Sequence, residues 1–275
     1  DYDHPQQGMA HAMRGIFGDD RVYNFNYLAL ARDGIDKAII NKMFIEEAAD
    51  FKPDWIWAQL QDTEVITAHS LAQVKEILPR CAITHWTGDV RPSVSPYLAS
   101  ICRATDLTLV CHKDLDRFRA AGAATARYCQ IAVDWHEDVQ GVPEWTPSFR
   151  VPDVVFIGSN YGSRFPGTKD REEAIRVLME AKINAGVVGS GWPISFPVIG
   201  NCEVKQQHQV WKRAKVALNI NNYNDVPGYY SDRQLIAMAS GTPVVCRYIP
   251  RLEEEFSQNV DCLWYNTPPE IAILV

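Results

Sequence analysis

Apolar residues recur along this chain with two periods, one typical of amphipathic helices and one of short buried strands. Residues 1–10 form a polar segment with Pro5 and Gly8, which we interpret as a loop. The pattern after it predicts helices at 11–17, 35–51, 67–78, 97–103 and 112–121, and strands at 22–25, 55–60, 82–86, 107–111 and 126–131. The helix at 35–51 is predicted from the helical spacing of Ile35, Ala38, Ile39, Met43, Ile45 and Ala48.

The periodicity lapses over residues 135–152, which contain three prolines and are the best candidate for a linker. It then restarts, with strands predicted at 154–157, 185–188, 217–220, 244–246 and 260–264, and helices at 169–182, 206–213, 231–240 and from 268 onward. Strands that alternate with helices indicate right-handed βαβ units and a parallel sheet. We therefore predict an α/β protein with two doubly wound, Rossmann-like domains, at 1–150 and 151–275, facing each other across a cleft.

One stretch, GYYSDRQLIAMASGTPVVCR at residues 228–247, reads as a loop, a helix, a turn and a buried strand. Ser231 is a suitable N-cap, with Gln234 where a capping box places Glu or Gln. Gly241 ends the helix where a left-handed residue is needed. A helix that begins in such a loop offers free amides and a positive dipole end to a phosphate, although an ordinary αβ unit explains the same pattern.

The segment SDRQLIAMASGTPVV resembles the C-terminal signature of group 1 glycosyltransferases, whose fold is called GT-B, and especially their CgeB-like branch of spore-maturation and phage type. Further pieces follow in the family's order: DYDHPQQG, KPDWIWAQ, HWTGDVR, DVVFIGSNYGSR, GVVGSGW and AKVALNINN. The resemblance implies that the first loop should follow a strand which is missing here, and that the last helix is cut short at Val275. It also implies transfer of a sugar from a nucleotide-diphosphate sugar to an acceptor hydroxyl.

Composition is that of a soluble globular protein, with 47% apolar and 22% charged residues. No apolar run is long enough for a membrane span. Seven cysteines without a CxxC pair argue against a disulfide framework, and most, such as Cys81, Cys111, Cys129 and Cys246, have apolar neighbours typical of core residues. We expect a reducing, cytoplasmic location, in the host cell if a phage encodes the protein.

Charge is unevenly distributed between the two halves. Residues 1–150 carry 15 basic and 21 acidic side chains, whereas residues 151–275 carry 12 and 13. An acidic first half is a poor partner for a polyanion, so a modified-DNA acceptor, conceivable for a phage enzyme, is a minor alternative to a glycan, protein or small molecule. Arg103, Lys113, Arg117 and Arg119 could still form a local basic patch.

Three glycine-rich loops of the second half follow predicted strands, where α/β sheets bind ligands. Arg164, in the first loop, is our candidate for pairing with a diphosphate, with Lys169 and Arg171 as rivals. A solvated cation near a helix start is an equally good explanation of each. The candidate donor-binding residues are Gly158, Ser159, Arg164, Gly189, Gly191, Asn219, Tyr230, Ser231, Asp232 and Arg233.

The chain departs from the resembled family at one functional position. The family carries Glu-x7-Glu across the 231–240 helix, and its second Glu holds the ribose, but Gly228 and Ile236 occupy the matching positions here. Asn219 and Asn221 are possible substitutes, although each alone is better explained by turn formation.

In the first half, Asp89 is the candidate base that accepts a proton from the acceptor hydroxyl. It follows a strand and precedes Arg91, so a helix cap or an ion pair would also explain it. His85 is a second catalytic candidate, or simply a buried histidine. The other acceptor-side candidates are Asp3, Gly8, Glu64, Arg91 and His112.

No DxD motif and no His/Cys cluster with metal-ligand spacing occurs, so we expect a metal-independent enzyme without a cofactor. Charge neutralisation by arginine and a helix N-terminus would then replace the metal. Two alternatives remain: an epimerase or hydrolase of nucleotide sugars with the same fold, and an inactive module kept for binding or assembly, which the missing Glu pair favours.

Overall fold

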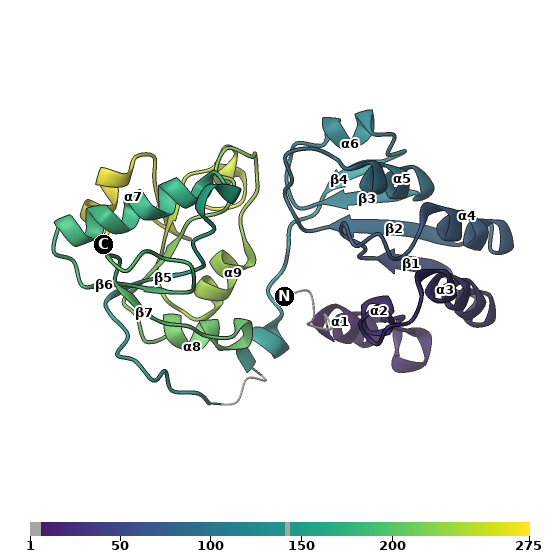
Figure 1. Cartoon of the computed structure of the whole chain (residues 1–275), viewed down its shortest axis with the longest axis horizontal. Coiled ribbons are helices and arrows are strands. Elements are labelled where there is room, and N and C mark those ends of the chain that lie inside the picture. Colours follow the sequence, from purple (N-terminus) through teal and green to yellow (C-terminus); the bar gives the residue numbers. More distant parts are fainter. Residues whose placement is uncertain (1–6, 141–143) are drawn as a thin grey trace. The chain divides into compact units, whose positions relative to one another are not determined.

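The computed structural model describes residues 7–140 and 144–275 and divides into two compact units, Asp1–Gln130 and Ile131–Val275 (Figure 1). The predicted linker at 135–152 therefore falls inside the second unit. Trp135–Gln140 forms a π-helical turn, η2, and the Trp145 amide donates to Gln209 Oε1 at 2.7 Å. Pro147 and Pro152 lie in irregular structure, and Trp145, Phe149 and Val151 pack against the core of the same unit.

Unit 1 contains a four-stranded parallel sheet in the order β1-β2-β3-β4. Its strands are β1 Trp55–Ala58, β2 Ala82–Thr87, β3 Leu107–Val110 and β4 Ala126–Tyr128. Its helices are α1 Gln7–Phe17, α2 Tyr27–Arg32, α3 Lys37–Phe51, α4 Ala68–Ile77, α5 Pro96–Ala104 and α6 Asp116–Ala120, with a short 3₁₀ turn, η1, at Asp19–Arg21.

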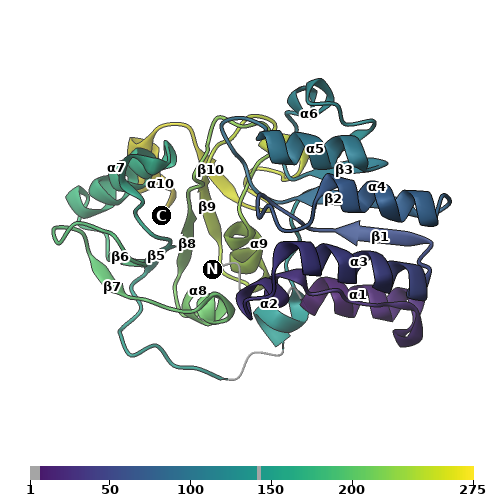
Figure 2. The ribbon, with the colours of Figure 1, turned by 45° about the vertical axis from the view of Figure 1, so that its right-hand side comes forward.

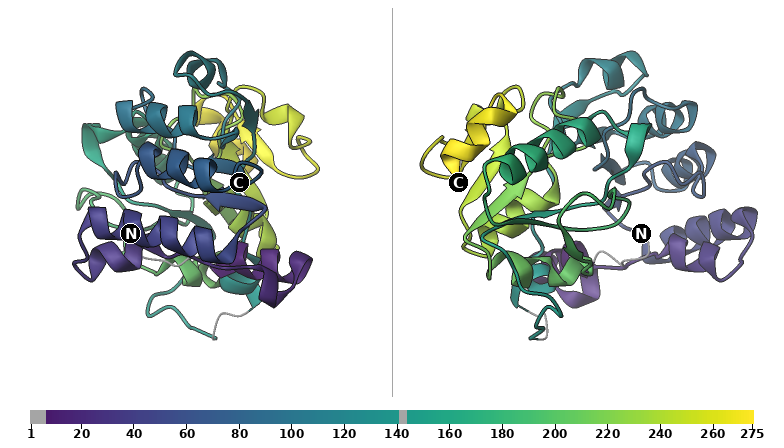
Figure 3. Two further views of the ribbon diagram at one scale, coloured as in Figure 1. Left: turned by 90° about the vertical axis from the view of Figure 1, so that its right-hand side faces the viewer. Right: turned by 60° about the vertical axis from the view of Figure 1, so that its left-hand side comes forward.

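Two apolar clusters hold these helices to the sheet. One joins Ile40 of α3, Leu71 of α4 and Ile101 of α5 to Ile83 of β2, and all four side chains are fully buried. The other joins α5 and α6 to β3 and β4. The left view of Figure 3 shows these helices, purple to blue, stacked alongside one another. Because successive strands lie side by side, the sheet of unit 1 winds in one direction only.

One local prediction for unit 1 is wrong. Residues 22–25 form no strand, because Tyr23 and Phe25 instead stack on Phe51 and Phe44 of α3. In the predicted helix α3, the buried residues are Ile40, Asn41 and Ala48, whereas Ile39 is 54% exposed. Asn41 is inside because it accepts hydrogen bonds from the Thr67 amide and Ser70 Oγ and donates to Val65 O, which ties α3 to the start of α4. Apolar periodicity cannot reveal such a buried polar hub.

Unit 2 contains a six-stranded parallel sheet in the order β10-β9-β8-β5-β6-β7, and Figure 2 labels all six strands. The strands are β5 Val154–Ile157, β6 Ala185–Val188, β7 Val198–Gly200, β8 Val216–Asn219, β9 Val244–Arg247 and β10 Leu263–Tyr265. The helices are α7 Gly167–Glu180, α8 Gln207–Trp211, α9 Asp232–Ala239 and α10 Ile271–Leu274, with short 3₁₀ turns η3 Gly162–Arg164, η4 Val204–Gln206, η5 Leu252–Glu254 and η6 Pro268–Glu270.

Two cores cover the two faces of this sheet. Residues of α7 and α10 pack with Phe156, Leu218 and Tyr265 on one face. Residues of α8 and α9 pack with Val155, Ile157 and other strand residues on the opposite face. Neighbouring residues of β5 therefore belong to different cores, as pleating requires. The sheet starts at β5 and winds both ways, so the strand order reverses between β5 and β8.

The predicted α/β class with two parallel-sheet domains is confirmed. Cys81, Cys111 and Cys246 are buried free thiols, as predicted for core residues, and Cys129 is half-buried. Within the described ranges, no helix has both the length and the apolar character that crossing a membrane requires.

Candidate functional site

The carboxyl ends of β5 and β8 form the point of unit 2 where the strand order reverses, which is where open α/β sheets bind ligands. The loop after β5 begins with Gly158 and Ser159, and β8 is followed by Ile220 and Asn221. These loops meet a third element, the first turn of α9.

Arg171 of α7 bridges the two loops and is completely buried. Its Nη1 donates to Ser159 O at 2.9 Å, while Nε and Nη2 donate to Ile220 O at 3.2 and 3.1 Å. It forms no ion pair with any residue that the structure describes. Burial, followed by the charge of Arg233, lowers the pKa of Arg171 to about 9. A buried cation without a counter-ion is costly, so this position favours an anion.

Arg233 of α9 supplies the second positive charge. Its guanidinium is close enough to Arg171 for the two charges to repel, and its Nε is buried without a hydrogen-bond partner in the described part of the chain. Two arginines brought together at a strand switch point, with no carboxylate paired to either within residues 7–140 and 144–275, form an anion-binding arrangement.

Most backbone amides of the first turn of α9 are already hydrogen-bonded, so fewer of them than predicted are free to bind an anion. The Ser231 amide donates to Asn221 Oδ1, the Arg233 amide to Asp232 Oδ1 and the Gln234 amide to Ser231 O. Of the four backbone amides at residues 231–234, only that of Asp232 makes no hydrogen bond to a described residue. The arginines, rather than a row of free amides, therefore provide most of the attraction for an anion.

The predicted Ser231–Gln234 capping box does not form. Ser231 occupies the N-cap position, but its Oγ donates to Asn219 Oδ1 at 3.2 Å instead of accepting from the helix. Gln234 is 1% exposed, and its Oε1 accepts from Asn219 Nδ2 at 3.0 Å. Asn219, at the end of β8, hydrogen-bonds to both side chains instead. Spacing within the helix cannot predict a partner that is distant in sequence.

Asn219 and Asn221 are likewise engaged with α9 and are almost fully buried, at 2% and 1% exposure. Their side chains hold the helix start against the end of β8. The structure thus gives them a positioning role and does not present them as substitutes for a ribose-binding Glu.

The loop after β5, at 158–164, and the loop after β6, at 189–191, lie against each other. An added Cβ on Gly189 would meet Gly158 O at 2.4 Å, and one on Gly191 would meet Asn160 O at 2.3 Å. Trp192 Nε1 donates to Gly158 O, and the Ser159 and Ser190 hydroxyls are 3.1 Å apart. Glycine is needed here for close packing of two backbones beside the site.

Other predicted donor residues lie elsewhere. Arg164 is exposed, with its guanidinium over the Phe165 ring at 5.3 Å, so Arg171, one of its two rivals, is the cation at the strand ends. Lys169 is exposed. Tyr230 is 5% exposed and stacks on Phe256 within the apolar core.

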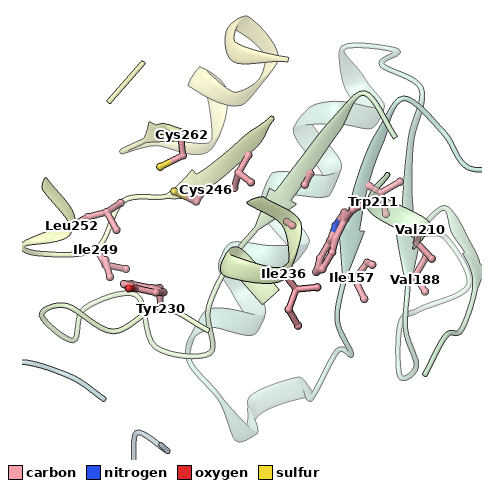
Figure 4. Packing of buried hydrophobic residues seen from close by; sticks show 14 residues of the cluster. Ile157, Val188, Val210, Trp211, Tyr230, Ile236, Cys246, Ile249, Leu252 and Cys262 are labelled. Atoms are coloured by element: carbon pink, nitrogen blue, oxygen red, sulfur yellow. The ribbon is translucent and has the colours of Figure 1, made fainter. Parts of the chain in front are cut away.

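Ile236, which matches the missing Glu, is also a core residue. It is 1% exposed, and Figure 4 shows its side chain near Trp211 and Ile157. Its place in the apolar core explains why an aliphatic residue is stable there. It also means that position 236 offers no hydrogen bond to a ribose.

In unit 1, Asp89 lies just beyond the carboxyl end of β2, and its side chain is 39% exposed. Arg91 Nη2 contacts Asp89 Oδ2 at 3.3 Å, and Arg91 Nε contacts Asp62 Oδ2 at the same distance. One arginine is therefore shared by two partly exposed carboxylates. Asp62, which follows β1, was missed because the aligned strand ends place it beside a residue that is distant in sequence.

His85 and His112 are both completely buried. His85 Nδ1 contacts Ala58 O at 3.2 Å, and burial lowers its pKa to about 4. Burial and then Arg117 lower the pKa of His112 to about 3. Its Nδ1 accepts from the Asp114 amide, and its Nε2 lies 2.6 Å from Arg117 Nη2. Both rings are therefore neutral groups of the interior of unit 1.

We expect unit 1 to lose stability as the pH falls from about 6.5 toward 4. Folded His85 stays neutral in this window while the unfolded chain takes up a proton, so the free energy of unfolding rises with pH. Each such histidine contributes about 1.4 kcal/mol per pH unit. The free energy of unfolding is measured by urea titration at pH 4.5, 5.5 and 6.5. It should rise less steeply with pH in His85→Gln than in the wild-type protein, and an equal rise in both would show that His85 does not titrate in this way.

The remaining candidates do not gather at Asp89. Glu64 is exposed with φ of 56°, Gly8 lies within α1, and Asp3 lies outside the described residues. The predicted basic patch is also dispersed, because Arg119 pairs with Asp116, Arg103 donates to Ala121 O and Arg117 contacts His112. Across residues 7–140 and 144–275, no group of three or more His, Cys, Asp or Glu side chains is arranged to hold a metal ion.

One family model matches the part of the chain that contains this site. Residues 171–275 match the family model described as "Glycosyl transferase-like", a range that includes Arg171, Arg233 and all of α9. No curated protein sequence matches the chain. The match therefore covers most of the second unit.

Similar solved structures share the fold at low sequence identity. The Anabaena protein Alr3699/HepE, in complex with UDP and glucose, is 16% identical at a TM-score of 0.54, covering 86% of this chain and 70% of its own. The catalytic domain of Arabidopsis thaliana starch synthase IV, bound to ADP and acarbose, is 11% identical at a TM-score of 0.55. The match covers 86% of this chain and 67% of that domain. The N-terminal domain of Candida albicans trehalose-6-phosphate phosphatase is 10% identical at a TM-score of 0.53, and the match covers 98% of this chain and 73% of that domain. The predicted GT-B fold class is confirmed.

Proposed function

We propose that this protein is a glycosyltransferase that moves a sugar from a nucleoside-diphosphate sugar to an acceptor hydroxyl. The pairing of Arg171 with Arg233 at the switch point of unit 2 carries the proposal. A diphosphate is an anion that suits this arrangement, since the buried Arg171 supplies a fixed positive charge and the partly exposed Arg233 can form a charge-assisted contact. Two solved structures of the same fold contain UDP or ADP, which supports this choice.

The reaction that we propose needs no metal ion, because Arg171, Arg233 and the dipole of α9 stabilise the charge that develops on the leaving diphosphate. Asp89 is the proposed base, since it is partly exposed and Arg91 fixes its orientation. The CgeB-like branch and a cytoplasmic location remain parts of this proposal. A glycan, protein or small-molecule acceptor is favoured over DNA, because the arginines of the predicted basic patch have other partners in unit 1.

Product analysis separates this function from its rivals. The protein is incubated with UDP- and ADP-hexoses and a mixture of hydroxyl acceptors, and the products are resolved by mass spectrometry. Transfer yields a nucleoside diphosphate and a glycosylated acceptor. Free hexose would indicate a hydrolase and a changed hexose an epimerase, while binding without any product would indicate an inactive module.

We also expect weak discrimination between ribose and 2′-deoxyribose in the donor. Ile236 is buried and apolar, and the amides of Asn219 and Asn221 are engaged with α9, so none of these side chains is available to a ribose hydroxyl. A site built around such a hydroxyl rejects the analogue that lacks it by about 10⁴- to 10⁵-fold. Here the dissociation constants of UDP and 2′-deoxy-UDP should differ by less than about tenfold in calorimetry, a small fraction of that range. A preference of several orders of magnitude would show that another group binds the ribose.

A further inference from the structure

A chain of side-chain amides runs from the start of α9 to one carboxylate on α7, and two of its members, Asp170 and Asn224, lie outside the residues that sequence reasoning selected. Asn224 Nδ2 donates to Asp170 Oδ2 at 2.7 Å, and Asn224 Oδ1 accepts from the Asn221 amide at 3.1 Å. Asn221 Oδ1 in turn accepts from the Ser231 amide at 2.9 Å. Three hydrogen bonds therefore connect Asp170 to the N-cap of α9.

The direction of this chain is fixed by its carboxylate end. An asparagine amide can be turned either way, but an ionised carboxylate can only accept. Asp170 therefore requires the NH₂ group of Asn224 to face it, which turns the Asn224 oxygen toward the Asn221 amide. The loop after β8 is held in the conformation that places Asn221 Oδ1 under the Ser231 amide.

We propose that Asp170 is a positioning residue, which through Asn224 and Asn221 fixes the first turn of α9 and the Arg233 that this turn carries. The inference rests on the proposed function for its ligand, because the same turn is the one that we assign to the donor diphosphate. Asp170 does not contact the ligand in this scheme. It holds the loop after β8 and the start of α9 in one arrangement before the ligand arrives, which lowers the cost of binding.

Two variants of α7 test the proposal. Asp170→Ala removes the acceptor of the chain, and Glu180→Ala removes the same charge at the exposed C-terminal end of the same helix. Asp170→Asn keeps an oxygen that can accept from Asn224 and serves as the conservative rescue. The first readout is hydrogen–deuterium exchange of the peptide that spans Ser231–Gln234, and the second is the affinity for UDP and ADP.

We expect about tenfold faster exchange over Ser231–Gln234 in Asp170→Ala, wild-type exchange in Glu180→Ala, and a largely restored rate in Asp170→Asn, the scale expected for one net hydrogen bond. The affinity for the nucleoside diphosphate that binds should fall by a similar factor in Asp170→Ala alone. Equal exchange in Asp170→Ala and Glu180→Ala would overturn the positioning role. If wild-type protein binds neither nucleotide, the proposed function fails, and the exchange measurement still decides whether Asp170 holds the helix.

Discussion

Replacing Asp89 with asparagine should lower the rate of sugar transfer by about 10²- to 10⁴-fold, the range for loss of a general base. Asparagine has the same shape and can keep a hydrogen bond to Arg91, but its amide cannot take the proton of an acceptor hydroxyl. The fold and the donor affinity should be unchanged, because Asp89 belongs to unit 1 and the proposed donor site to unit 2. Melting temperature, donor affinity and transfer rate are measured on the same variant.

Asp116→Asn is the matched control for this experiment. Asp116 is also an ion-paired carboxylate of unit 1, with Arg119 at 2.6 Å, but it is far more exposed and follows no strand end. A surface ion pair contributes at most about 1 kcal/mol, so neither change should unfold the protein. If folded Asp89→Asn protein transfers sugar as fast as Asp116→Asn protein, Asp89 is a structural carboxylate, and Asp62, which shares Arg91, becomes the next candidate.

Arg233→Ala should weaken the binding of a nucleoside diphosphate by about 1.5–3 kcal/mol, or roughly 10- to 150-fold in Kd. Arg233 is the better test of the arginine pair, because Arg171 also holds Ser159 O and Ile220 O, and its loss would leave these carbonyls unpaired. Removing Arg233 takes away one charge of the pair without disturbing the two loops. Isothermal titration calorimetry at fixed ionic strength measures the change.

Arg164→Ala and Arg176→Ala are its controls. Arg164 is exposed in the loop after β5, and Arg176 is exposed on α7, where it contacts Glu172. Both remove one positive charge from unit 2, so a general electrostatic effect would appear in all three variants. A loss that occurs in Arg164→Ala and not in Arg233→Ala would return the diphosphate to the loop at 158–164 and refute the site described above.

The periodic pattern predicted most of the fold because burial dominates it. Every strand except β7 was found from a short apolar run, and the helices α3, α4, α5 and α7 were found from spacing. The failures have two causes, which are competition from residues distant in sequence and, for one edge strand, a weak local pattern. Residues 22–25 pack their rings on α3 instead of joining the sheet. The edge strand β7 has only three residues, which is too short a run to show a strand pattern in the sequence.

The candidate site was predicted less completely, for a similar reason. The strands β5 and β8 and the helix α9 lie where the pattern predicts them, and their ends meet at the reversal of strand order, where open α/β sheets bind ligands. The choice between Arg164 and Arg171 could not be made from spacing, since it depends on which guanidinium reaches Ser159 O and Ile220 O across two loops. Gln234 was assigned to a capping box, whereas the end of β8 binds it.

The measurement that most directly tests the central claim is a comparison of UDP and ADP with uridine and adenosine as ligands of the wild-type protein. The arginine pair predicts that at least one diphosphate raises the midpoint of thermal unfolding, that the matching nucleoside has little effect, and that Arg233→Ala removes most of the shift. Stabilisation by the nucleosides alone, or a diphosphate shift that persists in Arg233→Ala, would contradict a diphosphate site at the start of α9.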